Sequence, residues 1–168
     1  DGFIEPKNKN IEVYDLKTKV LLPGLIDFHV HMESESGGKE KYINRFQDSK
    51  EDVAFKSTVV AKKTLLAGFT TVRDVGGSGV NIALRNAINR GLVDGPRIFT
   101  SGKTIATTGG HGDPTNGYRP DLVDDPGPQD GVVNSISDAR KAVRYRYKNG
   151  ADLIKITATG GVMSMAKN

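Results

Sequence analysis

The 168-residue sequence predicts an α/β fold, about the first four βα units of a (β/α)8 barrel preceded by part of a small β domain. After residue 24 the expected elements alternate as strand, helix, strand, helix, strand, long loop, helix and strand, and strict alternation indicates a parallel sheet. No GxGxxG pattern follows the first strand, which favours a barrel over an open doubly wound sheet. A complete barrel needs about 250 residues. Residues 23–168 would therefore form the first half of a barrel, and residues 1–22 a fragment of the β domain.

The strands are predicted from apolar runs between turn signals. Residues 11–22 alternate apolar and polar side chains around a turn at Lys17–Thr18 and predict a short hairpin-like piece. Four barrel strands follow, at residues 25–32, 69–75, 97–105 and 153–159. Arg73 and Asp74 end the second of them, and we expect a structural ion pair between these two side chains.

Three helices are predicted between the strands, each ending near a glycine. The first is expected to start at Ser49, which is followed three residues later by Asp52 in the manner of a helix cap, and to run to about residue 67. The second spans about residues 80–90. The third is capped by Ser135 or Ser137 and ends at residues 149–150. Before it lies a loop over about residues 107–134, and loops of this length are usually functional or disordered.

Composition excludes several classes of function. The net charge is +4, from 24 basic and 20 acidic residues, and the charges are interspersed, so neither a nucleic-acid nor a membrane partner is expected. The basic residues of 140–148 lie on a predicted helix as a solvated face. No run of 18 apolar residues exists. The absence of cysteine excludes disulfides but fixes no compartment; a signal peptide could precede Asp1, and of the compartments we favour the cytoplasm.

Two histidines, His29 and His31, lie two residues apart on the first predicted strand. Because strand side chains alternate, both imidazoles project from one face together with Asp27. The opposite row is apolar and consists of Phe28, Val30 and Met32. The polar row would point into the barrel at the carboxyl end of the strand, where barrel active sites lie. Two neutral imidazoles on one face can share a metal ion, although surface histidines also show this spacing.

Four blocks of sequence together resemble one enzyme superfamily. The run PGLIDFHVH resembles the PGxxDxHxH signature with which amidohydrolases enter the first barrel strand. The run LLAGFTTVRDVGG resembles the second-strand region of the branch containing imidazolonepropionases and prolidase-like enzymes. Residues 95–117 resemble the third strand and long loop of that branch, and residues 150–164 resemble its fourth strand. The resemblance covers nearly the whole chain, and within the branch the sequence is most similar to Xaa-Pro dipeptidases.

The resemblance implies a two-metal hydrolase. In this group the histidines corresponding to His29 and His31 bind one metal, and a lysine corresponding to Lys155, carboxylated by carbon dioxide, bridges it to a second. Zinc is the expected metal. Two further histidines, on strands five and six, and an aspartate after strand eight that acts as general base would all lie beyond Asn168. The segment thus carries no catalytic base, and we expect it to be inactive alone.

Two further positions can also be interpreted from their own surroundings. Lys155 shares a strand face with Leu153 and Thr157, and a buried charge is costly without a partner. Burial favours the neutral amine, which carbon dioxide can convert into an anionic oxygen ligand; the alternative is an exposed strand lysine. His111 follows the third strand among glycines. The resemblance implies that it contacts substrate, whereas a histidine that only holds the loop turn is the alternative.

The predicted function is hydrolysis of amide-type C–N bonds by metal-activated hydroxide, in an Xaa-Pro dipeptide or related small substrate. A cyclic-amide hydrolase or deaminase resembling imidazolonepropionase is one alternative, although several of those use one metal and no bridging lysine. A barrel that has lost its metal and serves in binding or assembly is the other. The expected partner is a small molecule or dipeptide, and the intact protein could form a homo-oligomer.

Overall fold

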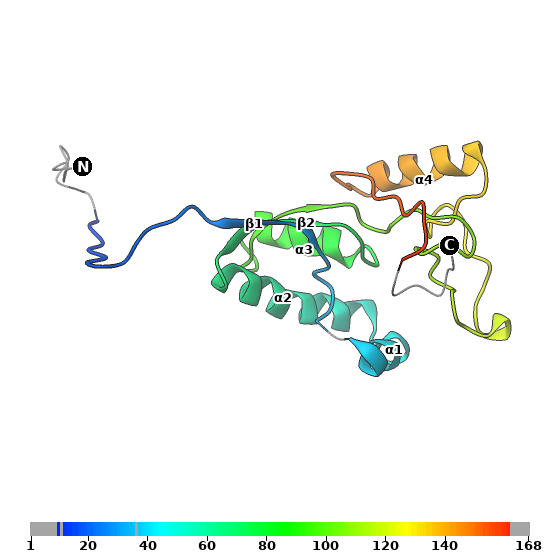
Figure 1. The fold of residues 1–168 in the computed structure, drawn as a ribbon, viewed down its shortest axis with the longest axis horizontal. Helices are drawn as coiled ribbons and strands as arrows, with labels where there is room; N and C mark the ends of the chain where they lie inside the picture. Colours follow the sequence, from blue (N-terminus) through cyan, green and yellow to red (C-terminus); the bar gives the residue numbers. More distant parts are fainter. Residues whose placement is uncertain (1–9, 11, 36, 162–168) are drawn as a thin grey trace.

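A computed structural model describes residue 10 and residues 12–35 and 37–161. Figure 1 shows the elements in chain order. They are β1 (Leu25–Val30), α1 (Gly38–Gln47), α2 (Lys50–Leu66), β2 (Phe69–Asp74), α3 (Val80–Asn89), β3 (Arg97–Thr100), the short 3-10 helix η1 (Pro120–Leu122) and α4 (Ile136–Lys148).

The three strands form one parallel sheet in the order β1-β2-β3. Strands β2 and β3 pair in continuous register, whereas the pairing of β1 with β2 shifts between Asp27 and Val30. Parallel neighbours joined by helices are the arrangement that the alternating sequence predicts. The prediction of a parallel α/β fold is therefore confirmed, and the carboxyl ends of the strands lie along one edge.

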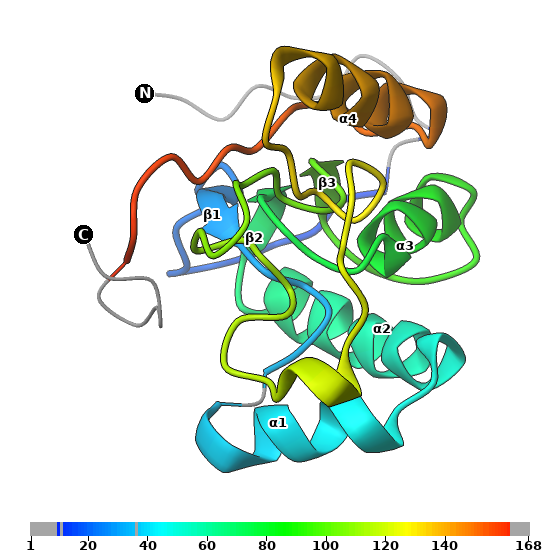
Figure 2. The same cartoon turned by 90° about the vertical axis from the view of Figure 1, so that its right-hand side faces the viewer.

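The main core lies between the sheet and helices α2 and α3, which lie on the same side of it (Figure 2). Its buried members come from the segment just after β1 and from α2, β2, α3 and β3; they are Met32, Ala61, Val72, Leu84 and Ile98. Val30 packs against them, but Phe28 is 64% exposed. The register shift next to Phe28 interrupts the simple alternation, so Phe28 does not join the apolar row expected from the sequence.

Local signals set the helix ends as predicted. The Ser49 hydroxyl accepts a hydrogen bond from the Asp52 N–H, and the Asp52 carboxylate accepts one from the Ser49 N–H, which together form a capping box at α2. Ser135, rather than Ser137, caps α4. Gly68 follows α2 with a φ of +95°, a conformation that glycine adopts without steric cost.

Two predicted β segments are not formed as strands. Residues 153–159 form no regular strand and make an isolated parallel bridge between Ile105 and Ile156, and the third strand ends at Thr100 rather than near residue 105. Residues 12–24 extend away from the sheet (Figure 1) and contain the predicted turn, with Lys17 at a φ of +51°, but no paired strands. Residues 1–9 and 11 lie outside the described part, so a separate β domain over 1–22 stays a prediction.

Helix α1 was not expected from the sequence. The helix carries the run YINRF, whose apolar residues have helical spacing. It contacts the long loop after β3: Arg45 donates a hydrogen bond of 3.1 Å to the Tyr118 hydroxyl, and the Phe46 and Tyr118 rings lie 5.9 Å apart. Helix α1, which follows the carboxyl end of β1, therefore holds part of the long loop after β3 through these two contacts.

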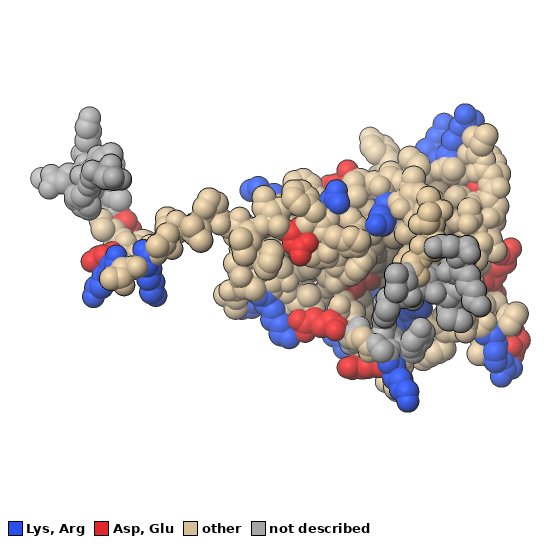
Figure 3. Space-filling view, viewed as in Figure 1, with Lys and Arg blue, Asp and Glu red and all other residues tan. Residues whose placement is uncertain are grey.

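Apolar side chains are exposed in two places in the described part. Leu25 and Ile26 on the edge strand β1, which pairs there only with β2, are each more than half exposed. Ile154 and Ile156, which follow α4, are exposed as well. On the face shown in Figure 3, basic and acidic side chains are interspersed. None of the helices in the described ranges is long and apolar enough to cross a membrane.

Candidate metal centre

The two histidines of the first strand lie at its carboxyl end. His29 is the penultimate residue of β1 and His31 directly follows the strand. Their ring centroids are 5.4 Å apart in an edge-to-face arrangement. The pKa of His29 is lowered, first by burial and then by the positive charge of Lys155 and by His31 and Arg73. A lowered pKa keeps the imidazole neutral, which is the form that binds a metal ion.

His31 is oriented by the backbone of the neighbouring loop. Its Nδ1 lies 2.8 Å from the Gly76 carbonyl oxygen. A carbonyl can only accept a hydrogen bond, so Nδ1 is the donor in this contact, and in a neutral imidazole the lone pair would then lie on Nε2. A donor bond from one ring nitrogen to a carbonyl is the usual support of a metal-binding histidine. A Cβ on Gly76 would lie 2.7 Å from the Thr104 hydroxyl oxygen and 3.4 Å from His31 Cε1, so this close approach requires glycine.

Lys155 reaches the same region from the other end of the described chain. Its carbonyl accepts a hydrogen bond of 2.9 Å from the Ile105 N–H, and the Ile105 carbonyl accepts one from Thr157. Lys155 is half-buried, as are Leu153 and Thr157 on the same face, whereas Ile154 and Ile156 are exposed. The predicted two-faced pattern is present although no regular strand forms, and the lysine lies near enough to His29 to lower its pKa.

His111 lies on an exposed turn of the long loop. The buried Asp113 organises this turn by accepting hydrogen bonds from the N–H groups of Gly109 and Thr115 and from the Thr115 hydroxyl. Burial raises the pKa of Asp113, but these hydrogen bonds outweigh it and the pKa is lowered. A Cβ on Gly161 would lie 3.2 Å from His111 Nδ1, so the loops after β3 and after residues 153–159 meet at this imidazole.

The expected ion pair between Arg73 and Asp74 is wrong. Arg73 donates a 2.7 Å hydrogen bond to the Phe28 carbonyl, and its guanidinium lies 5.6 Å from the centre of the Phe28 ring. Asp74 is fully buried and bonded to N–H groups instead. Alternation explains the separation, because consecutive residues of a strand point to opposite faces of the sheet.

The donor set fits one side of a metal centre. Two imidazoles lie side by side, one of them is held through Nδ1 by a backbone carbonyl, and a half-buried lysine acts electrostatically on the other. Within the described ranges, however, no group of three or more His, Cys, Asp or Glu side chains is placed to hold a metal ion. A stable centre with His29 and His31 therefore requires further oxygen or nitrogen ligands, either from a modified Lys155 or from another part of the protein.

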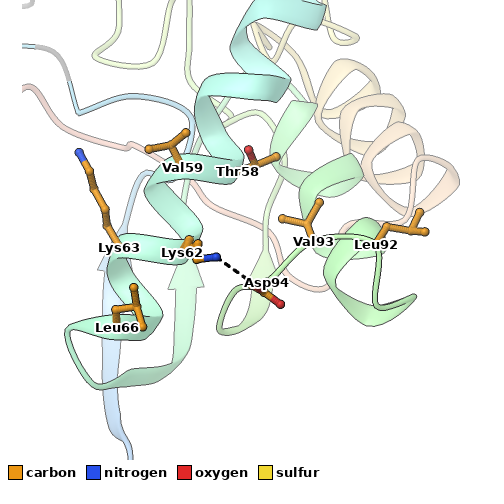
Figure 4. Close-up of a pocket in the computed structure, with 8 residues that line it drawn as sticks. All are labelled: Thr58, Val59, Lys62, Lys63, Leu66, Leu92, Val93 and Asp94. Atoms are coloured by element: carbon orange, nitrogen blue, oxygen red, sulfur yellow. Dashed lines mark hydrogen bonds and ion pairs between the residues drawn. The ribbon is translucent and has the colours of Figure 1, made fainter.

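A groove of about 480 Å³ lies away from these residues, between α2 and residues 92–94. Figure 4 shows its lining, with Lys62 reaching to Asp94 at 3.4 Å across the opening. None of the sequence-predicted site residues contributes to the groove.

Comparison with known proteins agrees with the resemblance that the sequence shows. The model of the family described as "Amidohydrolase family" matches residues 20–168. Ochratoxinase from Aspergillus niger is 32% identical over 167 aligned residues, which cover 90% of this chain and 34% of that enzyme. The chain thus spans about a third of the length of the curated relatives that it matches.

Solved structures with a similar fold also match this chain over about a third of their own length. The crystal structure of a Xaa-Pro dipeptidase with bound methionine in its active site has a TM-score of 0.80 and 54% identity, over 87% of this chain and 36% of that one. A prolidase in complex with N-methylphosphonate-L-proline has a TM-score of 0.71 and 37% identity, also over 87% of this chain and 36% of that one.

Proposed function

Because this chain belongs to the amidohydrolase family, we propose that the intact protein is a metal-dependent hydrolase of amide-type C–N bonds, with Xaa-Pro dipeptides as its substrate class. The observation that carries the proposal is the pair of imidazoles of His29 and His31 at the carboxyl end of β1, with the positive charge of Lys155 lowering the pKa of His29. The substrate class is supported by the 54% identity to a Xaa-Pro dipeptidase. A prolidase complex with a proline-containing phosphonate, at 37% identity, supports it as well.

The proposal assigns a role to each residue at this edge. His29 and His31 would hold a divalent cation through their imidazole nitrogens, and Lys155, as a carbamate, would supply an anionic oxygen ligand to the centre. Zinc suits this mixed nitrogen and oxygen set. Divalent cations in such a site supply hydroxide near neutral pH and polarise the substrate carbonyl. His111 contacts the substrate from the loop that meets Gly161.

The remaining ligands and the general base are proposed to come from the part of the protein that corresponds to the other two thirds of the relatives. That base would move the proton from the nucleophile to the leaving amine. The proposal therefore requires two histidines and an aspartate at the carboxyl ends of later barrel strands.

The substrate class is tested with purified full-length protein and a panel of compounds. We expect Xaa-Pro dipeptides to be cleaved with a higher kcat/KM than Xaa-Ala dipeptides, and chelation of the metal to abolish the activity. Ochratoxin and an imidazolone complete the panel, because one relative is an ochratoxinase and cyclic amides are the alternative class. Cleavage of the imidazolone alone would contradict the dipeptidase proposal.

A second prediction concerns residues 1–168 expressed alone. The unpaired edge of β1 and the exposed Leu25, Ile26 and Ile156 are surfaces that promote association between chains. We expect this chain to elute as oligomers or aggregates in size-exclusion chromatography and to hydrolyse no dipeptide at any metal concentration. A monodisperse monomer with peptidase activity would contradict both the open-barrel interpretation and the need for further ligands.

A further inference from the structure

The carboxylate of Asp74 is fully buried at the end of β2. None of the ion pairs between described residues involves it. A buried carboxylate is costly unless hydrogen bonds replace its hydration. Its pKa is raised, first by burial, although three N–H donors oppose that effect. Because burying this carboxylate costs free energy, we infer that it has a structural or functional role.

The three donors connect Asp74 to both sides of His31. Asp74 Oδ2 accepts from the backbone N–H of Met32, the residue directly after His31, at 3.1 Å. Asp74 Oδ1 accepts from the backbone N–H of Gly76 at 3.2 Å, and the carbonyl of Gly76 is the acceptor for His31 Nδ1 at 2.8 Å. The same oxygen accepts from the Asn81 side chain at 3.1 Å. One carboxylate therefore fixes the backbone that carries His31 and the carbonyl that orients its ring.

A second carboxylate holds the same loop from its other end. Glu33 accepts hydrogen bonds from the N–H groups of Ser78 at 2.7 Å and Asn81 at 2.9 Å, at the start of α3. A carboxylate is favourable at a helix N-terminus. Hydrogen bonds to Asp74 and Glu33 therefore hold the turn that contains Gly76 from both sides. These bonds keep the Gly76 carbonyl next to His31 Nδ1.

We propose that Asp74 is a positioning residue that sets the tautomer and direction of the His31 imidazole through Gly76, so that Nε2 faces the metal side before any metal is bound. The role in metal binding rests on the proposed function; the control of the tautomer does not. Asparagine at position 74 would offer one acceptor oxygen instead of two, so at least one of the N–H groups of Met32 and Gly76 would lose its acceptor.

The test uses metal-free, full-length protein labelled with nitrogen-15 in histidine. Long-range proton–nitrogen NMR identifies which ring nitrogen carries the proton, and the His31 signal is assigned from its loss in His31→Gln. We expect the Nδ1–H tautomer in the wild type and a mixture of both tautomers in Asp74→Asn. Val72→Ala is the matched control, because it removes buried volume from the same strand without removing these hydrogen bonds, and it should keep the Nδ1–H tautomer.

Titration with cobalt(II) alone gives the second readout. We expect Asp74→Asn to bind cobalt about 10–100-fold more weakly than the wild type, as is typical when the support of a metal-binding histidine is removed, and Val72→Ala to bind normally. An Nε2–H tautomer in the wild type overturns the proposal without any variant. It is also overturned if Asp74→Asn keeps a single Nδ1–H tautomer. If cobalt leaves the wild-type His31 signal unchanged while Asp74→Asn alters the tautomer, the positioning role stands and the proposed metal role of His31 fails.

Discussion

Replacing Lys155 by alanine is expected to remove at least one equivalent of bound metal from the full-length protein and to lower turnover more than about 100-fold. This loss of turnover exceeds the effect of removing an indirect support of a metal site, because Lys155 is proposed to bind the metal directly. The structural basis is the half-buried position of Lys155 and its electrostatic influence on His29. A short carboxylic acid should partly restore the activity by occupying the space that the side chain vacates.

The proposed carboxylation of Lys155 can be measured directly. The neutral lysine amine attacks the carbon of carbon dioxide, a nitrogen–carbon bond forms, one proton is released, and the product is an anionic carbamate. Carbon NMR of wild-type protein reconstituted with zinc and carbon-13 bicarbonate should show a carbamate signal that is absent from Lys155→Ala. Fully metallated, active wild-type protein without this signal would exclude Lys155 as the bridge and favour a single-metal centre.

Two variants control for charge and for surface effects. Lys155→Arg keeps the positive charge but should lose metal as Lys155→Ala does, because guanidinium does not supply the carbamate. Lys62→Ala removes an exposed lysine on the outer groove, where it only pairs with Asp94. This variant should retain both metal and turnover.

The second large effect is expected for the double substitution His29→Ala with His31→Ala. The two rings lie 5.4 Å apart at the strand end, so their loss should remove at least one equivalent of zinc and abolish measurable hydrolysis. Metal content is measured by elemental analysis after dialysis. His111→Ala is the matched control: it should retain the metal but raise KM, because His111 is proposed to contact substrate. Unchanged metal content in the double variant would refute the assignment of His29 and His31.

Much of the local structure could be predicted because its signals are local. The Ser49 and Asp52 pair starts α2 through hydrogen bonds within four residues, and Gly68 ends the helical segment without steric cost. The spacing of His29 and His31 likewise requires only an extended backbone to place both rings near each other. The parallel sheet followed from the order of these local elements.

Other features depend on partners that are distant in sequence. Residues 153–159 have the composition of a strand, yet a strand forms only when a neighbour continues alongside, and β3 ends at Thr100. Asp74 was expected to pair with Arg73. Instead, the Asp74 carboxylate is buried and accepts hydrogen bonds from the N–H groups of Met32 and Asn81, while Arg73 donates to the Phe28 carbonyl. No pattern within a single segment predicts either outcome.

Local signals in the sequence were enough to predict the three parallel strands, helices α2, α3 and α4, and the pair of histidines at the end of β1, because periodicity, caps and residue spacing act over a few residues. Long-range packing brings the positive charge of Lys155 close enough to lower the pKa of His29, and it places the Gly76 carbonyl oxygen 2.8 Å from His31 Nδ1. These contacts join residues 126 and 45 positions apart, and their formation depends on the packing of the sheet against α2 and α3 rather than on any local preference.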